Sequence, residues 1–82
     1  MEAQTIKEKG LLALYKTLEP EKLYVFAEIR AILMDAGASI QYATLLIKEL
    51  EYHGVLERVR RGVYKVNKNK LTKLAKQYGL LR

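Results

Sequence analysis

The residues with the most distinctive chemistry in this 82-residue sequence are cations near its C-terminal end. Arg60-Arg61-Gly62 separates two short β-prone runs, and Arg58 and Lys65 stand on either side of it. A short connection that contains Gly predicts a tight β-hairpin with two arginines at its tip. Guanidinium groups bind phosphate oxygens and fit a narrow, electronegative groove, so this tip is predicted to meet a polyanion.

The distribution of charge along the chain favours the same kind of partner. The chain has 15 basic and nine acidic residues, which gives a net charge of +6. Residues 1–57 hold six basic and nine acidic residues, whereas residues 58–82 hold nine basic residues and no acidic one. Such segregation is typical of proteins that bind nucleic acid, and less often of those that bind anionic membranes. The alternative is a solvated basic surface that only keeps the protein in solution.

The residue types in the sequence give little indication of a catalytic site. The sequence has no Cys, which excludes disulfides, thiolate zinc sites and cysteine nucleophiles. Asp35, Ser39 and His53 are each the only residue of their type. Ser39 is placed to cap a helix and His53 to end one, which accounts for both without a triad. We therefore expect no enzyme activity, no metal site, no cofactor and no small-molecule substrate.

The hydropathy pattern contains no membrane-spanning segment. No apolar run approaches the ~20 residues that a bilayer requires. We expect a soluble, cytoplasmic protein without a membrane partner. The alternative left open is that the basic C-terminal segment lies on a membrane surface as an amphipathic helix.

The first elements that must position these residues are two helices and a short strand. Thr5-x-x-Glu8 is a capping box, and apolar residues then recur at helical spacing until Pro20. Gly10 inside this helix costs up to ~1 kcal/mol relative to Ala, which indicates either a weak first turn or close packing at that position. Residues 23–26 are β-prone and predict an edge strand, and residues 27–35 return to helical spacing.

A third helix, a hairpin and a last helix complete the predicted fold. Ser39 is a good N-cap for a helix that runs to about His53, where Gly54 ends it. Residues 55–59 and 63–66 predict the two strands of the hairpin. Asn69 is the expected cap of a basic amphipathic helix that ends near Gly79.

The stretch SIQYATLLIKEL at 39–50, followed by EYHGVLER at 51–58, resembles the recognition helix and first wing strand of winged-helix transcriptional regulators. VRRGVY at 59–64 looks like their wing and is also similar to the N-terminal domain of abortive-infection antitoxins. The resemblance covers about residues 23–67. It implies a winged helix-turn-helix (about 26–54) and a two-stranded wing (about 55–66). Together with the chain length and the helical patterns at both ends, this predicts a mostly helical α+β fold in one domain, 1–82, with an additional C-terminal helix (about 69–79).

This resemblance implies that the protein binds double-stranded DNA and regulates transcription, or that it acts in chromatin or plasmid maintenance. The third helix would enter the major groove, and the wing would lie on phosphate or in the minor groove. Carried over by position, the DNA-binding residues are Gln41, Tyr42, Thr44, Leu45 and Lys48 on the helix, with Arg58, Arg60, Arg61 and Lys65 on the wing. Gln suits adenine, Thr or Leu suits a thymine methyl group, and Lys suits phosphate or guanine.

Two alternatives remain open at this stage. Ile40 and Leu45 are apolar residues on the same predicted face, so the domain could be a protein-interaction module in a larger replication, transcription or antitoxin complex. The apolar stripe of the last helix could dock on the first helix of the same chain or form a homodimer. Three of the six tyrosines fall off the predicted apolar faces and could be exposed: Tyr24, Tyr42 and Tyr52.

Overall fold

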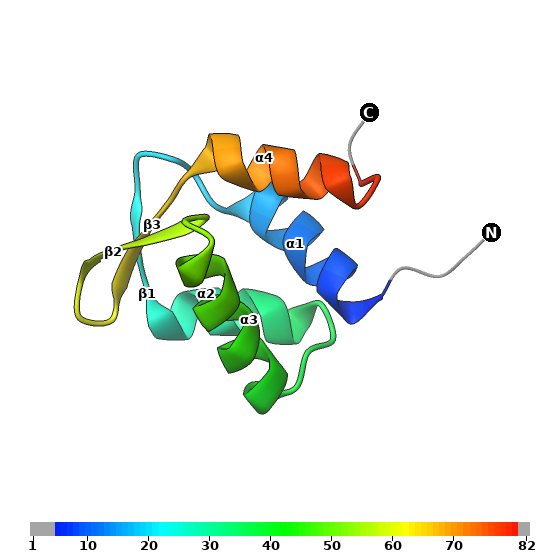
Figure 1. Cartoon of the computed structure of the whole chain (residues 1–82). Coiled ribbons are helices and arrows are strands. Elements are labelled where there is room, and N and C mark those ends of the chain that lie inside the picture. The colour runs from blue at the N-terminus through cyan, green and yellow to red at the C-terminus, as the bar shows by residue number, and fades with distance from the viewer. Residues whose placement is uncertain (1–4, 81–82) are drawn as a thin grey trace.

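The computed structural model describes residues 5–80, which form a mostly helical α+β fold with four helices and three antiparallel strands (Figure 1). In chain order the elements are α1 (Ile6–Thr17), β1 (Leu23–Val25), α2 (Phe26–Asp35), α3 (Ile40–Tyr52), β2 (Leu56–Arg60), β3 (Val63–Val66) and α4 (Lys68–Gln77). This confirms the predicted α+β class and the predicted order of helices and strands. No helix among the described residues is both long and apolar enough to cross a bilayer.

Most predicted helix boundaries are confirmed, and two are wrong. The Thr5–Glu8 capping box and the Ser39 cap are both present. The last helix is capped by Asn67, whose side chain accepts a hydrogen bond from Lys70 N–H, and not by Asn69, which lies inside α4. The first helix ends at Thr17, so the chain is already extended at Leu18, before Pro20.

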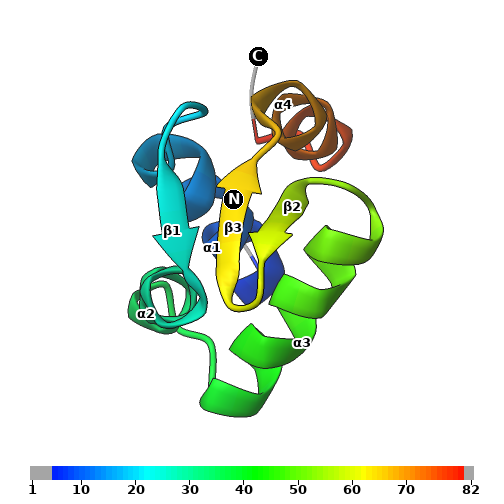
Figure 2. The ribbon, with the colours of Figure 1, turned by 90° about the vertical axis from the view of Figure 1, so that its left-hand side faces the viewer.

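The two strands of the hairpin and the short strand β1 form one three-stranded sheet. β3 lies in the centre, with β2 on one side and β1 on the other (Figure 2). β1 pairs with β3 in the register Leu23 to Lys65, which confirms the expected edge strand and identifies its partner. The backbone N–H of Phe26, at the start of α2, donates to the carbonyl of Gly62 at 2.9 Å. The hairpin turn is therefore fastened to α2.

Apolar residues from all four helices and from β2 and β3 form one buried core. Gly10 lies where α1 crosses α2, and a Cβ atom there would stand 2.9 Å from Leu33 Cδ2. This confirms the close packing that Gly10 indicated. The ten largest fully buried side chains are Leu11, Leu14, Leu18, Ile29, Leu33, Leu46, Ile47, Leu50, Leu56 and Leu71.

The two terminal helices pack against each other within one chain. The buried face of α4 presents Leu71 and Ala75, and α1 presents Leu11 and Leu14. Of the two arrangements that the sequence left open for this stripe, the structure contains the intrachain one. The ammonium group of Lys68 donates to the carbonyl oxygens at the end of α1, those of Tyr15 and Leu18.

Lys68 is expected to stabilise the fold because a cation there satisfies helix carbonyls that lack an intrahelical partner. Lys68→Met keeps the aliphatic stem and removes the donor, so it should lower the free energy of unfolding by about 1–2 kcal/mol. Urea denaturation at unchanged m-value measures the effect. Lys9→Met on the exposed face of α1 is the matched control, with an expected change within about 0.5 kcal/mol. Equal effects of the two variants would contradict the capping role.

Candidate nucleic-acid interface

One face of α3 is directed to solvent along the whole helix. Gln41, Leu45, Lys48 and Tyr52 follow one another at intervals of three or four residues, and all four are exposed. We call these four residues the outward stripe of α3. The opposite face is anchored in the core by Ala43, Leu46, Ile47 and Leu50.

Ion pairs fasten the two flanks of this stripe to different elements. On one flank, Lys7 Nζ of α1 donates to Glu49 Oε1 at 2.8 Å. On the other flank, Arg58 Nε of β2 lies 3.3 Å from Glu51 Oε2. Two residues correspond to about 200° around an α-helix, so the two carboxylates leave α3 in nearly opposite directions. The outward stripe therefore lies between an α1 side and a β2 side.

The pair on the α1 side keeps Lys7 charged. The hydrogen bond to Glu49, and then the one to Tyr78, raise the pKa of the Lys7 ammonium well above its usual value. The Lys7 ammonium also lies 5.4 Å from the centre of the Tyr78 ring. The carboxylate of Glu49 is thereby neutralised locally by a permanent cation.

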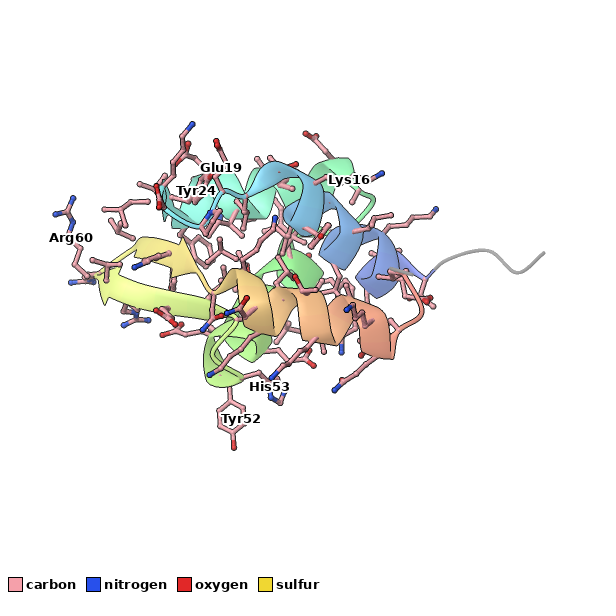
Figure 3. All side chains as sticks on the ribbon, turned by 90° about the horizontal axis from the view of Figure 1, so that it is seen from above. Lys16, Glu19, Tyr24, Tyr52, His53 and Arg60 are labelled. Atoms are coloured by element: carbon pink, nitrogen blue, oxygen red, sulfur yellow. The ribbon has the colours of Figure 1, made fainter. Side chains whose placement is uncertain are left out.

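The β2–β3 hairpin carries Arg60 and Arg61 at its tip, as predicted. β2 ends at Arg60, and Gly62 has a φ of +74°, a conformation that favours Gly. The strand register shifts between Arg58 and Arg60, which places an irregularity at Val59 and twists the end of the strand. Figure 3 shows Arg60 projecting from the tip, away from the body of the molecule. Both arginines are exposed.

The structure separates the other two cations predicted for the hairpin. Arg58 is opposite Tyr64 in the register, and its guanidinium lies 6.0 Å from the centre of the buried Tyr64 ring. Lys65 is opposite Glu57, one position along, so its side chain lies on the other face of the sheet. Arg58 therefore lies beside α3 and is already paired with Glu51, whereas Lys65 lies on the outer face of the sheet.

Two of the predicted residues on α3 are less available than expected. Tyr42 is half-buried and packs against the core. The hydroxyl of Thr44 donates to the carbonyl of Ile40 at 2.9 Å, a bond within the helix. The outward stripe consists instead of Gln41, Leu45 and Lys48, together with a residue that the prediction did not include.

That residue is Tyr52, the last residue of α3, whose exposed fraction of 86% is the largest among the large apolar residues that the structure describes. Figure 3 shows its ring projecting from the body of the molecule beside His53, and the two ring centres are 5.3 Å apart. Of the three tyrosines expected to be exposed, Tyr24 and Tyr42 are half-buried. The spacing of four residues from Lys48 is the sequence signal that identifies Tyr52.

Most carboxylates are occupied by local partners, which leaves many cations free for a ligand. Glu8 and Glu28 accept backbone hydrogen bonds at the starts of α1 and α2. Glu19 pairs with Lys22 at 2.8 Å, and Glu49 and Glu51 form the ion pairs described above. Within residues 5–80, the cations outside any ion pair include Lys48, Arg60, Arg61, Lys65, Lys70, Lys73 and Lys76.

The side chains between residues 5 and 80 form no group of three His, Cys, Asp or Glu residues that could hold a metal ion. The hydroxyl of Ser39 accepts a hydrogen bond from the N–H of Tyr42 at 3.1 Å, the capping role expected from the sequence.

No model of a known protein family matches the chain, and no match was found among curated proteins or among solved structures.

Proposed function

We propose that the protein is a winged-helix module that binds double-stranded DNA, with α3 in the major groove and the hairpin as the wing. The observation that carries this proposal is the outward stripe of α3 beside a hairpin tip that holds Arg60 and Arg61. The core anchors the other face of the helix, so the stripe is held in a fixed orientation. Transcriptional regulation is the biological role that we propose for this binding.

The dimensions and chemistry of α3 support this proposal. A helix of 13 residues is about 20 Å long, and the major groove of B-DNA, about 12 Å wide, admits an α-helix. Gln41 can pair with an adenine edge and Leu45 can contact a thymine methyl group, while Lys48 can reach a phosphate or a guanine. The hydroxyl of an exposed tyrosine such as Tyr52 can donate a hydrogen bond to a phosphate oxygen.

The proposal is tested by fluorescence anisotropy of a labelled random duplex at several salt concentrations, beside a single-stranded probe of equal length. Three cations in contact with phosphate, Lys48, Arg60 and Arg61, predict that log K falls with log salt with a slope of about −3, and each further phosphate contact steepens the slope by about 0.9. The duplex should be preferred over the single strand. Absence of duplex binding at low salt would contradict DNA binding, and equal affinity for both probes would contradict insertion of α3 into a duplex groove.

A second candidate function is favoured by two exposed apolar side chains on α3. Ile40 is 54% exposed and Leu45 is 61% exposed. Apolar residues in such positions are also typical of a helix face that docks on another protein. A helix face that only docks on another protein predicts no salt-dependent binding of the duplex, so the same titration separates the two functions.

A further inference from the structure

A groove lies between α1, the C-terminal end of α3 and α4, on the opposite flank of α3 from the hairpin. Its volume is about 390 Å³, and its apolar lining residues are Leu50, Val55 and Leu74. The polar side chains that line it, apart from Glu49, are Lys7, His53, Lys70, Lys73, Gln77 and Tyr78. We call it the α4 groove.

The charge of the α4 groove suits an anion. Glu49 is the only carboxylate among its lining residues, and Lys7 already neutralises it at 2.8 Å. Lys70 and Lys73 therefore add two positive charges for which the groove offers no further anionic partner. The Lys70 ammonium lies beside Gly54, where a Cβ atom would stand 2.6 Å from Nζ. The glycine that ends α3 thus gives this ammonium room at the end of the helix.

The position of the α4 groove relates it to the outward stripe. Glu49 and His53, one helical turn apart, line the groove, so the groove lies on the α1 side of α3. The hairpin lies on the β2 side, where Arg58 pairs with Glu51. A helix that lies in the major groove has a phosphodiester strand on each side of it. The two basic regions that flank α3 therefore match the two strands that border the groove.

We propose that the α4 groove binds a phosphate of the DNA strand that lies across the major groove from the strand contacted by the wing. Lys70 and Lys73 are the residues that hold it, and Gln77 and Tyr78 supply neutral hydrogen-bond donors. This inference rests on the proposed function, since it requires α3 to lie in a duplex groove. It assigns the basic residues of α4 to a second, separate phosphate contact.

The test compares Lys70→Gln/Lys73→Gln with the single variant Lys76→Gln by anisotropy on the same duplex over a series of salt concentrations. Glutamine keeps most of the side-chain stem and removes the charge. Lys76 is an exposed lysine of α4 that does not line the groove, so it reports the effect of net charge alone. The double variant should weaken binding about threefold to tenfold and reduce the salt slope by about 2.

The double replacement Lys70→Arg/Lys73→Arg should keep affinity within about twofold, since the charge is retained. When Lys70→Gln/Lys73→Gln is combined with replacement of the hairpin arginines, the reductions in salt slope should add, because the two contacts are on different DNA strands. If the loss of duplex affinity per charge removed is no larger for Lys70→Gln/Lys73→Gln than for Lys76→Gln, the α4 groove is not a phosphate site. DNA binding by α3 and the wing would still stand. If the unaltered protein binds no duplex, the proposed function fails and this inference with it.

Discussion

Replacement of Arg60 and Arg61 by Ala is expected to weaken binding to every duplex by about tenfold or more. The salt slope should fall by about 1 to 2 units, since each lost phosphate contact removes about 0.9. The loss should be similar for all DNA sequences, because contacts with phosphate position a protein and carry no sequence information. Anisotropy titrations on two unrelated duplexes measure both quantities.

The fold should survive this change because both arginines are exposed and stand at the hairpin turn. The far-UV circular dichroism spectrum and the thermal midpoint are therefore expected to stay unchanged. Lys9→Ala/Lys16→Ala is the matched control, since it removes two exposed charges from α1, and Figure 3 shows Lys16 far from the hairpin tip. If the control weakens binding equally, net charge and not the wing accounts for the affinity, and the assignment of the wing is wrong.

Leu46→Ala is expected to lower the free energy of unfolding by about 2–5 kcal/mol. Leu46 is 2% exposed and lies in the core where α3 packs against the rest of the molecule. Its truncation removes buried apolar surface and leaves a cavity. A small domain changes its thermal midpoint by roughly 4–8 °C per kcal/mol, so a fall of about 10 °C or more is expected. Thermal denaturation followed by circular dichroism measures it.

Leu45→Ala is the control, since it makes the same chemical change one residue earlier on the same helix. Leu45 is 61% exposed, so its replacement should change stability by no more than about 0.5 kcal/mol. The pair of variants therefore separates the buried face of α3 from its outward stripe. Equal destabilisation by the two variants would mean that α3 does not present these faces as the structure has them.

The helices were predictable because their ends are marked by local chemistry. Thr5 and Ser39 cap α1 and α3 with their own hydroxyl groups, and Gly54 takes the positive φ that follows α3. Each signal lies within a few residues of the boundary that it sets. The cap of α4 was placed two residues late because Asn67 and Asn69 have the same side chain, and only the pairing of β3 decides where the helix can begin.

The candidate site was predictable only in part because its geometry depends on contacts between distant residues. The hairpin tip follows from the local sequence, and so does the side of α3 that faces outward. By contrast, the pairing of Arg58 with Glu51 follows from how β2 lies against α3. The α4 groove brings together Lys7, Glu49 and Lys70, which are more than 20 residues apart in the chain. No local sequence pattern indicates that these three residues line the same groove.

The central position of β3 has a consequence for the order in which the protein can form during synthesis. β1 and β2 have no strand partner in the sheet until β3 joins them, and the end of α1 receives Lys68 only after β3 is complete. Residues 1–57, which precede the hairpin turn, hold six basic and nine acidic residues and carry a net charge of −3, and the four basic residues of 58–66 bring the sum to +1. The segment that completes the sheet is also the segment that reverses the sign of the charge. The net charge summed from residue 1 therefore changes from negative to positive as the fold closes.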